Sequence, residues 1–190
     1  MKRVDVKRIF DIASSLGGII IASPILLGTA ALIKLESPGP VIFKQRRPGL
    51  DNHIFNIYKF RSMKIDTPNV ATDKINASQF ITKTGKLIRK TSIDELPQLF
   101  NILKGDMSVV GPRPALYNQY ELIEKRTNAN VHTIKPGLTG LAQVMGRDDI
   151  TDDQKVAYDR WYLENQTALL DIYIIYKTIK STIKSEGVSH

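Results

Sequence analysis

The most constraining feature of this chain is an uncharged stretch of 22 residues, numbers 12–33. A helix of this length can cross the hydrocarbon core of a bilayer. A cleaved signal peptide normally has a shorter apolar stretch, and a buried helix of a soluble core is unusual this close to a terminus. The stretch therefore predicts a membrane segment.

Basic residues flank the stretch on both sides: Lys2, Arg3, Lys7 and Arg8 precede it, and Lys34, Lys44, Arg46 and Arg47 follow it. Since positive residues prefer the cytoplasmic side, a simple span would place one group on the wrong side. Pro24 removes a helical hydrogen bond and disfavours helical geometry at Ser23, whose hydroxyl can satisfy a freed carbonyl. A proline alone more often only kinks a membrane helix. Together with the charges, it predicts a re-entrant helix that breaks at Ser23-Pro24.

The remainder of the chain predicts an α+β fold that is mostly helical. Strands over Val41–Lys44 and Phe55–Phe60, with a turn over Arg47–Asn52 between them, predict a short β-hairpin. Residues 66–79 are polar and aperiodic, which indicates an exposed loop. Helices are expected over Gly85–Lys90, Leu96–Leu103 and Ala115–Lys125, and as a pair within Thr151–Lys184.

The last of these helices is amphipathic. Its apolar side holds Leu169, Leu170, Ile172, Tyr173, Ile175, Tyr176, Ile179 and Ile183, and its polar side holds Lys177, Lys180 and Lys184. It fits a helix in the membrane interface, with tyrosines at the depth of the headgroups. It fits equally an amphipathic helix packed on a protein core.

Composition narrows the chemistry. Twenty-seven Lys and Arg against 19 Asp and Glu give a net charge of +8, which favours anionic partners: nucleic acid, lipid headgroups or phosphorylated substrates. The chain has no cysteine, so disulfides, thiolate metal sites and a thiol nucleophile are excluded. The three histidines lack close metal-ligand spacing, which argues against a histidine zinc site.

Adjacent carboxylates at Asp94 and Glu95 are the central candidate for catalysis. On a helix they point about 100° apart, so one can attack while the other helps to hold a metal. Ser92 and Glu95 also match a capping box, but Pro97 would then cost a helical hydrogen bond. A helix that starts nearer Asp94 tolerates Pro97 in its first turn. Its N-terminus would attract anions and keep the Asp94 carboxylate ionised.

Several cations near this pair are candidates for binding phosphate. Prolines on both sides of Arg113 stiffen its backbone, and an aimed guanidinium suits bidentate phosphate contact. Lys59 lies on a predicted strand and Arg89 precedes the carboxylates. The simpler interpretations are a rigid loop with a solvated arginine and a strand face open to solvent. A glycine-rich segment over residues 136–147 adds Gln143 and Arg147 as weaker polar candidates.

These motifs together resemble the bacterial sugar transferases, specifically the small monotopic phosphoglycosyl transferases. The matching strings are Lys7–Asp11, Ser23-Pro24, Gly39–Phe43, Arg47–Gly49, Tyr58–Arg61, Ser92–Asn101, Lys104–Pro114 and Pro136–Val144. They keep the order of the family and span nearly the whole chain.

The resemblance implies an enzyme that transfers a phospho-sugar from a UDP-sugar, usually N-acetylated, to a polyprenyl phosphate such as undecaprenyl phosphate, and releases UMP. It implies that Asp94 attacks the phosphate and carries the phospho-sugar covalently, that Glu95 assists, and that Mg²⁺ binds at this pair. Lys59, Arg89 and Arg113 would hold phosphates. Gln143 and Arg147 would contact the nucleotide, and Asp159, at an acidic position of the family, is a further candidate for binding substrate.

The resemblance also implies a place in the cell. Residues 1–36 would form the re-entrant membrane hairpin, and residues 37–190 a catalytic domain on the cytoplasmic face of the bacterial inner membrane. There it would perform the first membrane step of glycoconjugate assembly, with no nucleic acid as partner. The alternative is a basic membrane-surface or nucleic-acid-binding module without catalysis. It agrees with the charge, but the chain lacks the usual nucleic-acid-binding motifs.

Overall fold

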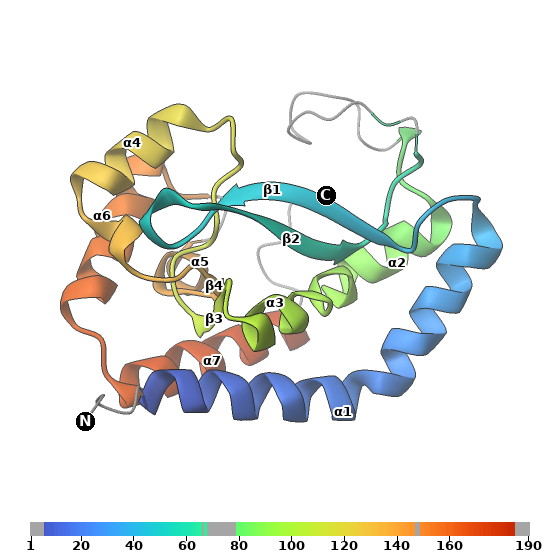
Figure 1. Cartoon of the computed structure of the whole chain (residues 1–190), viewed down its shortest axis with the longest axis horizontal. Coiled ribbons are helices and arrows are strands. Elements are labelled where there is room, and N and C mark those ends of the chain that lie inside the picture. The colour runs from blue at the N-terminus through green and yellow to red at the C-terminus, as the bar shows by residue number, and fades with distance from the viewer. Residues whose placement is uncertain (1–5, 66, 68–78, 147–148, 185–190) are drawn as a thin grey trace.

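A computed structural model describes residues 6–65, 67, 79–146 and 149–184. Its longest element is α1 (Val6–Glu36), which runs along the base of the molecule in Figure 1. By length and composition α1 can cross a membrane, and only 11% of its most apolar stretch is buried by the rest of the protein. The predicted long apolar helix is therefore present, and most of its apolar surface is left uncovered.

The α1 helix bends near its middle. Figure 1 shows a first half along the base and a second half that rises toward β1. Pro24 lies inside the helix, and the Ser23 hydroxyl donates to the Ile20 carbonyl, with 2.8 Å between the oxygens. A proline that cannot donate to the preceding turn accounts for such a bend. The expected break at Ser23-Pro24 is thus a bend within a continuous helix.

The N-terminal end of α1 is fastened to the interior of the protein. The Arg8 guanidinium donates to two carbonyls at the end of α3 (Gln98–Lys104), with N–O distances of 2.6 and 2.7 Å. Asp11 is 2% exposed and accepts a hydroxyl and an amide hydrogen bond from β3 (Ser108–Val110), both 2.9 Å long. These bonds explain the polar residues at the start of an apolar helix.

The C-terminal end of α1 is fastened to the same body. The Glu36 carboxylate accepts from two backbone N–H groups in the first turn of α2 (Lys83–Lys90), at 2.7 and 3.0 Å. Ile33 is buried in one cluster with Phe60 and Ile88. Both ends of α1 therefore contact one globular unit.

The predicted hairpin is confirmed. Strands β1 (Ile42–Pro48) and β2 (Ile54–Phe60) pair antiparallel, with Gln45 opposite Ile57, and the short 3₁₀ turn η1 (Leu50–Asn52) joins them. Ile57 packs with residues of α3 in a buried cluster. The hairpin therefore carries its side chains directly over the N-terminal end of α3, where the carboxylate pair lies.

A second, parallel sheet was not predicted. In it β3 pairs with β4 (Gly137–Thr139), a strand too short and rich in glycine to show period-two alternation. The helix α4 (Tyr120–Asn128) begins five residues later than expected. The reason is local: the Gln119 side chain accepts from the Leu116 N–H at 2.7 Å and closes a turn there instead.

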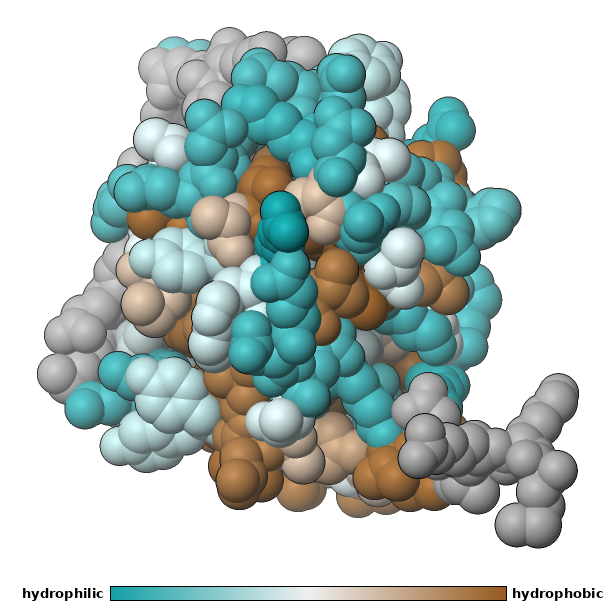
Figure 2. All heavy atoms as spheres, turned by 90° about the vertical axis from the view of Figure 1, so that its left-hand side faces the viewer, coloured by the Kyte–Doolittle hydropathy of each residue, from teal (hydrophilic) through white to brown (hydrophobic). Residues whose placement is uncertain are grey.

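The predicted pair of C-terminal helices is present as α6 (Asp152–Glu164) and α7 (Ala168–Lys184), and the short helix α5 (Leu141–Met145) within the glycine-rich segment was not predicted. Helix α7 buries Ile174 in the core but leaves apolar side chains exposed on its outer side: Leu169, Ile172, Tyr173, Tyr176 and Ile179. Lys7 of α1 reaches Asp171 of α7 at 2.6 Å. Figure 2 shows hydrophobic residues gathered along the lower edge, where α1 and α7 lie, below a mostly hydrophilic surface.

Candidate active site

The carboxylate pair lies on a short 3₁₀ turn, η4 (Ile93–Glu95), immediately before α3. Ser92 adopts a left-handed conformation with φ of 56°, and its side chain makes no capping hydrogen bond. The capping-box interpretation is therefore wrong. The helical path begins at Ile93, and Pro97 takes helical dihedral angles as the residue before α3, where its missing N–H costs little.

Two cations from different elements hold Glu95. Its Oε1 accepts from Lys59 Nζ of β2 at 2.8 Å and from Arg113 Nη2 at 2.6 Å. Burial alone would raise the pKa of Glu95, but the charges and hydrogen bonds of Arg113 and Lys59 lower the pKa well below its usual range. Glu95 is therefore ionised throughout the physiological range and is committed to two internal partners.

The Asp94 carboxylate is different. Within the part of the chain that the structure describes, no hydrogen bond or ion pair engages it. Burial raises the pKa of Asp94 to about 6; Lys59 opposes this shift, and the negative charge of Glu95 adds to it. The helix N-terminus was expected to keep this carboxylate ionised, but the pKa of Asp94 is raised rather than lowered, because desolvation outweighs the nearby positive charge. Asp94 is still mostly ionised at neutral pH.

Two further arginines complete a positively charged environment. Arg89, at the end of α2, lowers the pKa of Asp94 by its charge, and its Nη1 lies 3.8 Å from the sulfur of Met63. Arg47 of β1 was not predicted as a site residue. Burial and the charge of Arg113 lower the pKa of Arg47 to about 10. In the sequence Arg47 belongs to the family string Arg47–Gly49, but it was interpreted as the first residue of the hairpin turn. The site thus suits a ligand with several negative charges.

The other predicted residues lie elsewhere. Gln143, on α5, donates to the Leu138 carbonyl at 3.3 Å, and its own Oε1 is buried without a partner. Asp159, on α6, is 1% exposed and ion-paired with Arg126 at 2.6 Å. Arg147 lies outside the described residues. Their proposed contacts with substrate therefore stay predictions.

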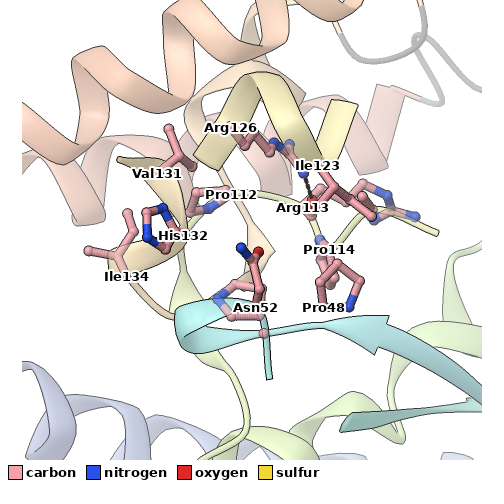
Figure 3. Close-up of a pocket in the computed structure, with 13 residues that line it drawn as sticks. Pro48, Asn52, Pro112, Arg113, Pro114, Ile123, Arg126, Val131, His132 and Ile134 are labelled. Atoms are coloured by element: carbon pink, nitrogen blue, oxygen red, sulfur yellow. Dashed lines mark hydrogen bonds between the residues drawn. The ribbon is translucent and has the colours of Figure 1, made fainter. Parts of the chain in front are cut away.

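A pocket adjoins the site without containing the carboxylates. It lies between the hairpin turn and α4, as Figure 3 shows, and is lined by Asn52, Pro112, Arg113, Arg126 and His132, among others. Arg113 is the residue that both features share. The pocket therefore lies next to the phosphate-binding candidates rather than around Asp94.

The residues present could hold a metal ion only with help from a substrate. The described residues contain no group of three or more His, Cys, Asp or Glu side chains that could hold one. Mg²⁺ is often held by one or two carboxylates together with substrate phosphates and water. Asp94 fits that role because no described residue forms a hydrogen bond or ion pair with its carboxylate, whereas Glu95 is occupied by two cations.

The family model for the bacterial sugar transferases matches residues 1–185. The chain is 43% identical to the "Uncharacterized sugar transferase EpsL" of Bacillus subtilis, over 96% of this chain and 89% of that relative. It is 42% identical to an Aeromonas hydrophila enzyme named UDP-N-acetylgalactosamine-undecaprenyl-phosphate N-acetylgalactosaminephosphotransferase, over 96% of this chain and 44% of that relative. The chain is 41% identical to the undecaprenyl-phosphate galactose phosphotransferase of Salmonella typhimurium, over 95% of this chain and 41% of that relative. The chain thus spans less than half of the last two relatives.

The pKa of Asp94 predicts an unusual effect on stability. Its value of about 6 lies above the ordinary 3.8, so the folded state binds a proton that the unfolded chain releases between these pH values. Stability therefore falls as the pH rises through this window, by roughly 1–3 kcal/mol. We expect Asp94→Asn to raise the unfolding temperature at pH 7.5 and to leave it unchanged at pH 4. Thermal unfolding in detergent measures both.

The exposed Asp149 is the matched control, because Asp149→Asn alters a carboxylate outside the site. This variant should match the parent protein at both pH values. An Asp94→Asn protein that is less stable than the parent at pH 7.5 would contradict the inferred burial cost.

Proposed function

Because the chain belongs to the bacterial sugar transferase family, we propose that it transfers a sugar phosphate from a UDP-sugar to undecaprenyl phosphate. The names of several relatives, which include undecaprenyl-phosphate galactose and glucose phosphotransferases, support this reaction. The observation that carries the proposal is the Asp94 carboxylate, which lies in the field of Lys59, Arg89 and Arg113 and has no hydrogen-bond or ion-pair partner among residues 6–65, 67, 79–146 and 149–184. The alternative, a basic membrane-surface or nucleic-acid-binding module without catalysis, does not explain this carboxylate among cations. The family relationship also argues against it.

Asp94 is the nucleophile in the proposed reaction. A carboxylate oxygen of Asp94 attacks the phosphorus next to the sugar, and the bond from this phosphorus to the bridging oxygen breaks, so that UMP leaves. The phospho-sugar is then an acyl phosphate on Asp94. An oxygen of the lipid phosphate attacks the same phosphorus, and Asp94 leaves as a carboxylate. Every atom of the donor is thus accounted for in UMP and the lipid diphosphate sugar.

The cations stabilise the charge of the diphosphate. Arg113 can offer its guanidinium to phosphate oxygens, and Arg89 and Lys59 add positive potential at Asp94. Glu95 assists in a specific way. Its low pKa makes it a poor proton acceptor, but its charge holds Lys59 and Arg113 next to Asp94. We therefore assign Glu95 a positioning role.

Mg²⁺ is part of the proposal. Asp94 would hold the ion together with phosphate oxygens of the donor, and the bound ion would neutralise charge that develops on the leaving phosphate. We expect EDTA to stop UMP release and added Mg²⁺ to restore it. Mg²⁺ added to the protein with a UDP-sugar, but without lipid acceptor, should raise the unfolding temperature. Thermal unfolding detects this effect without a complete catalytic cycle. Full activity in EDTA would contradict the metal requirement.

We propose further that α1 is re-entrant and that the enzyme is monotopic on the cytoplasmic face of the inner membrane. Support comes from the bend at Pro24 and from the hydrogen bonds at both ends: Asp11 to β3, and Glu36 to α2. A helix that crossed the bilayer would separate these ends. The exposed apolar sides of α1 and α7 would then lie in one membrane surface.

Cysteine labelling tests this topology, since the chain has no cysteine of its own. Val6→Cys and Asp51→Cys should resist an impermeant maleimide in intact spheroplasts and react after lysis. Ile21→Cys, at a side chain that is 82% exposed on the apolar side of α1, should react slowly in both cases. Labelling of residue 6 in intact spheroplasts would show a true span.

The nucleophile assignment predicts that Asp94→Asn abolishes UMP release from a panel of UDP-sugars, with N-acetylated sugars among them. An amide lacks the charge and nucleophilicity of a carboxylate. Asp149→Asn, on an exposed surface, should keep the activity of the parent protein. Near-normal UMP release by Asp94→Asn would rule out Asp94 as the attacking group.

A further inference from the structure

The segment that presents Arg113 has an unusual set of hydrogen-bond partners. Three successive carbonyls each accept from a different part of the chain: Pro112 from the N–H of Gly137 at 2.9 Å, Arg113 from Arg126 Nη1 at 2.7 Å, and Pro114 from Arg47 Nη1 at 2.8 Å. Two of the three donors are side chains of arginine. Figure 3 shows Arg126 reaching the Arg113 backbone from α4.

Arg126 is itself held in place. Its Nε and Nη2 both donate to one oxygen of Asp159, at 3.0 and 2.6 Å. The Asp159 side chain is almost fully buried, and that of Arg126 is 11% exposed. This carboxylate is therefore engaged inside the protein. From α6, Asp159 thus holds the arginine side chain that contacts the Arg113 backbone.

The two arginine contacts fix the direction of the Arg113 side chain. They hold the peptide planes on the C-terminal side of Arg113 and Pro114, while the proline rings restrict φ at positions 112 and 114. With the backbone held in this way, the guanidinium of Arg113 reaches Glu95 Oε1 at 2.6 Å. Loss of either contact would leave a carbonyl of this segment without its partner and free the backbone to turn.

Apart from the ion pair of Arg126 with Asp159, charge repulsion works against arginines at this segment. Arg47 and Arg126 approach a segment that already carries Arg113, and the charge of Arg113 disfavours that of Arg47. A neutral donor would satisfy the same carbonyls without repulsion. Guanidinium groups, however, provide donors in a fixed planar geometry. They suit a backbone that must be placed accurately.

We propose that Arg126, held by Asp159, and Arg47 are positioning residues that aim Arg113 at Glu95 and at the donor phosphates. Neither arginine needs to touch the substrate for this role. The part of this inference that concerns the phosphates rests on the proposed function; the part that concerns the backbone does not.

Hydrogen exchange tests the backbone part without any substrate. In Arg126→Gln the amides of Arg113, Ala115 and Leu116 should exchange about tenfold faster or more, while those of α7 stay unchanged. Asp159→Asn, a milder change, should act in the same direction. The neighbouring Lys125→Gln breaks only exposed ion pairs with Glu121 and Asp153 and should have no effect on this segment. Unchanged exchange at residues 113–116, or equal acceleration of α7, would overturn the proposal.

A double-mutant cycle on UMP release tests the link to Arg113. Arg126→Gln should lower kcat/KM for the UDP-sugar about tenfold to a hundredfold, mainly through a higher KM, since small misplacements of binding groups have effects of this size. In a protein that already carries Arg113→Lys, Arg126→Gln should lower kcat/KM by less than about twofold. Fully additive effects would overturn the proposal. If the parent protein releases no UMP, the proposed function fails, and hydrogen exchange alone decides the inference.

Discussion

The ion pairs of Glu95 with Lys59 and Arg113 join three parts of the fold at one point: the hairpin, the turn before α3 and the segment after β3. A carboxylate this buried is costly unless it is paired, so the pairs also fix where the three parts meet. Lys59 and Arg113 are engaged by Glu95, and among the described residues Asp94 has no hydrogen-bond or ion-pair partner. Burial raises the pKa of Asp94, and a carboxylate available to a charged substrate is what the proposed nucleophile requires.

Helix α1 is attached to the elements around this site through both of its ends. Arg8 and Asp11 bind the end of α3 and the start of β3, and Glu36 binds the first turn of α2. Helix α1 is therefore attached directly to α2, which carries Arg89, and to α3 and β3, which adjoin the turn of Asp94 and the segment of Arg113. In the proposed reaction, which brings a lipid phosphate and a nucleotide sugar together, this attachment would keep the catalytic groups near the membrane surface.

Much of this could be predicted from the sequence, and the failures have physical causes. The apolar helix, the hairpin and the last two helices follow from local patterns that tertiary contacts do not override. The pKa of Asp94 was misjudged because burial depends on residues distant in the sequence. The same holds for Arg47, whose role appears only where β1 meets the segment of Pro114. Asp159 was predicted as a substrate-binding candidate, and its ion pair with Arg126 was not foreseen, because Arg126 comes from another helix and no local pattern links the two.

The central claim is that Asp94 carries the sugar phosphate covalently during the reaction. Mass spectrometry of the protein after incubation with a UDP-sugar and Mg²⁺, without lipid acceptor, tests it most directly. We predict a mass increase equal to one sugar phosphate, located on the peptide that contains Asp94, and its loss when undecaprenyl phosphate is added. UMP release that requires the lipid from the start, with no adduct on this peptide, would contradict the claim.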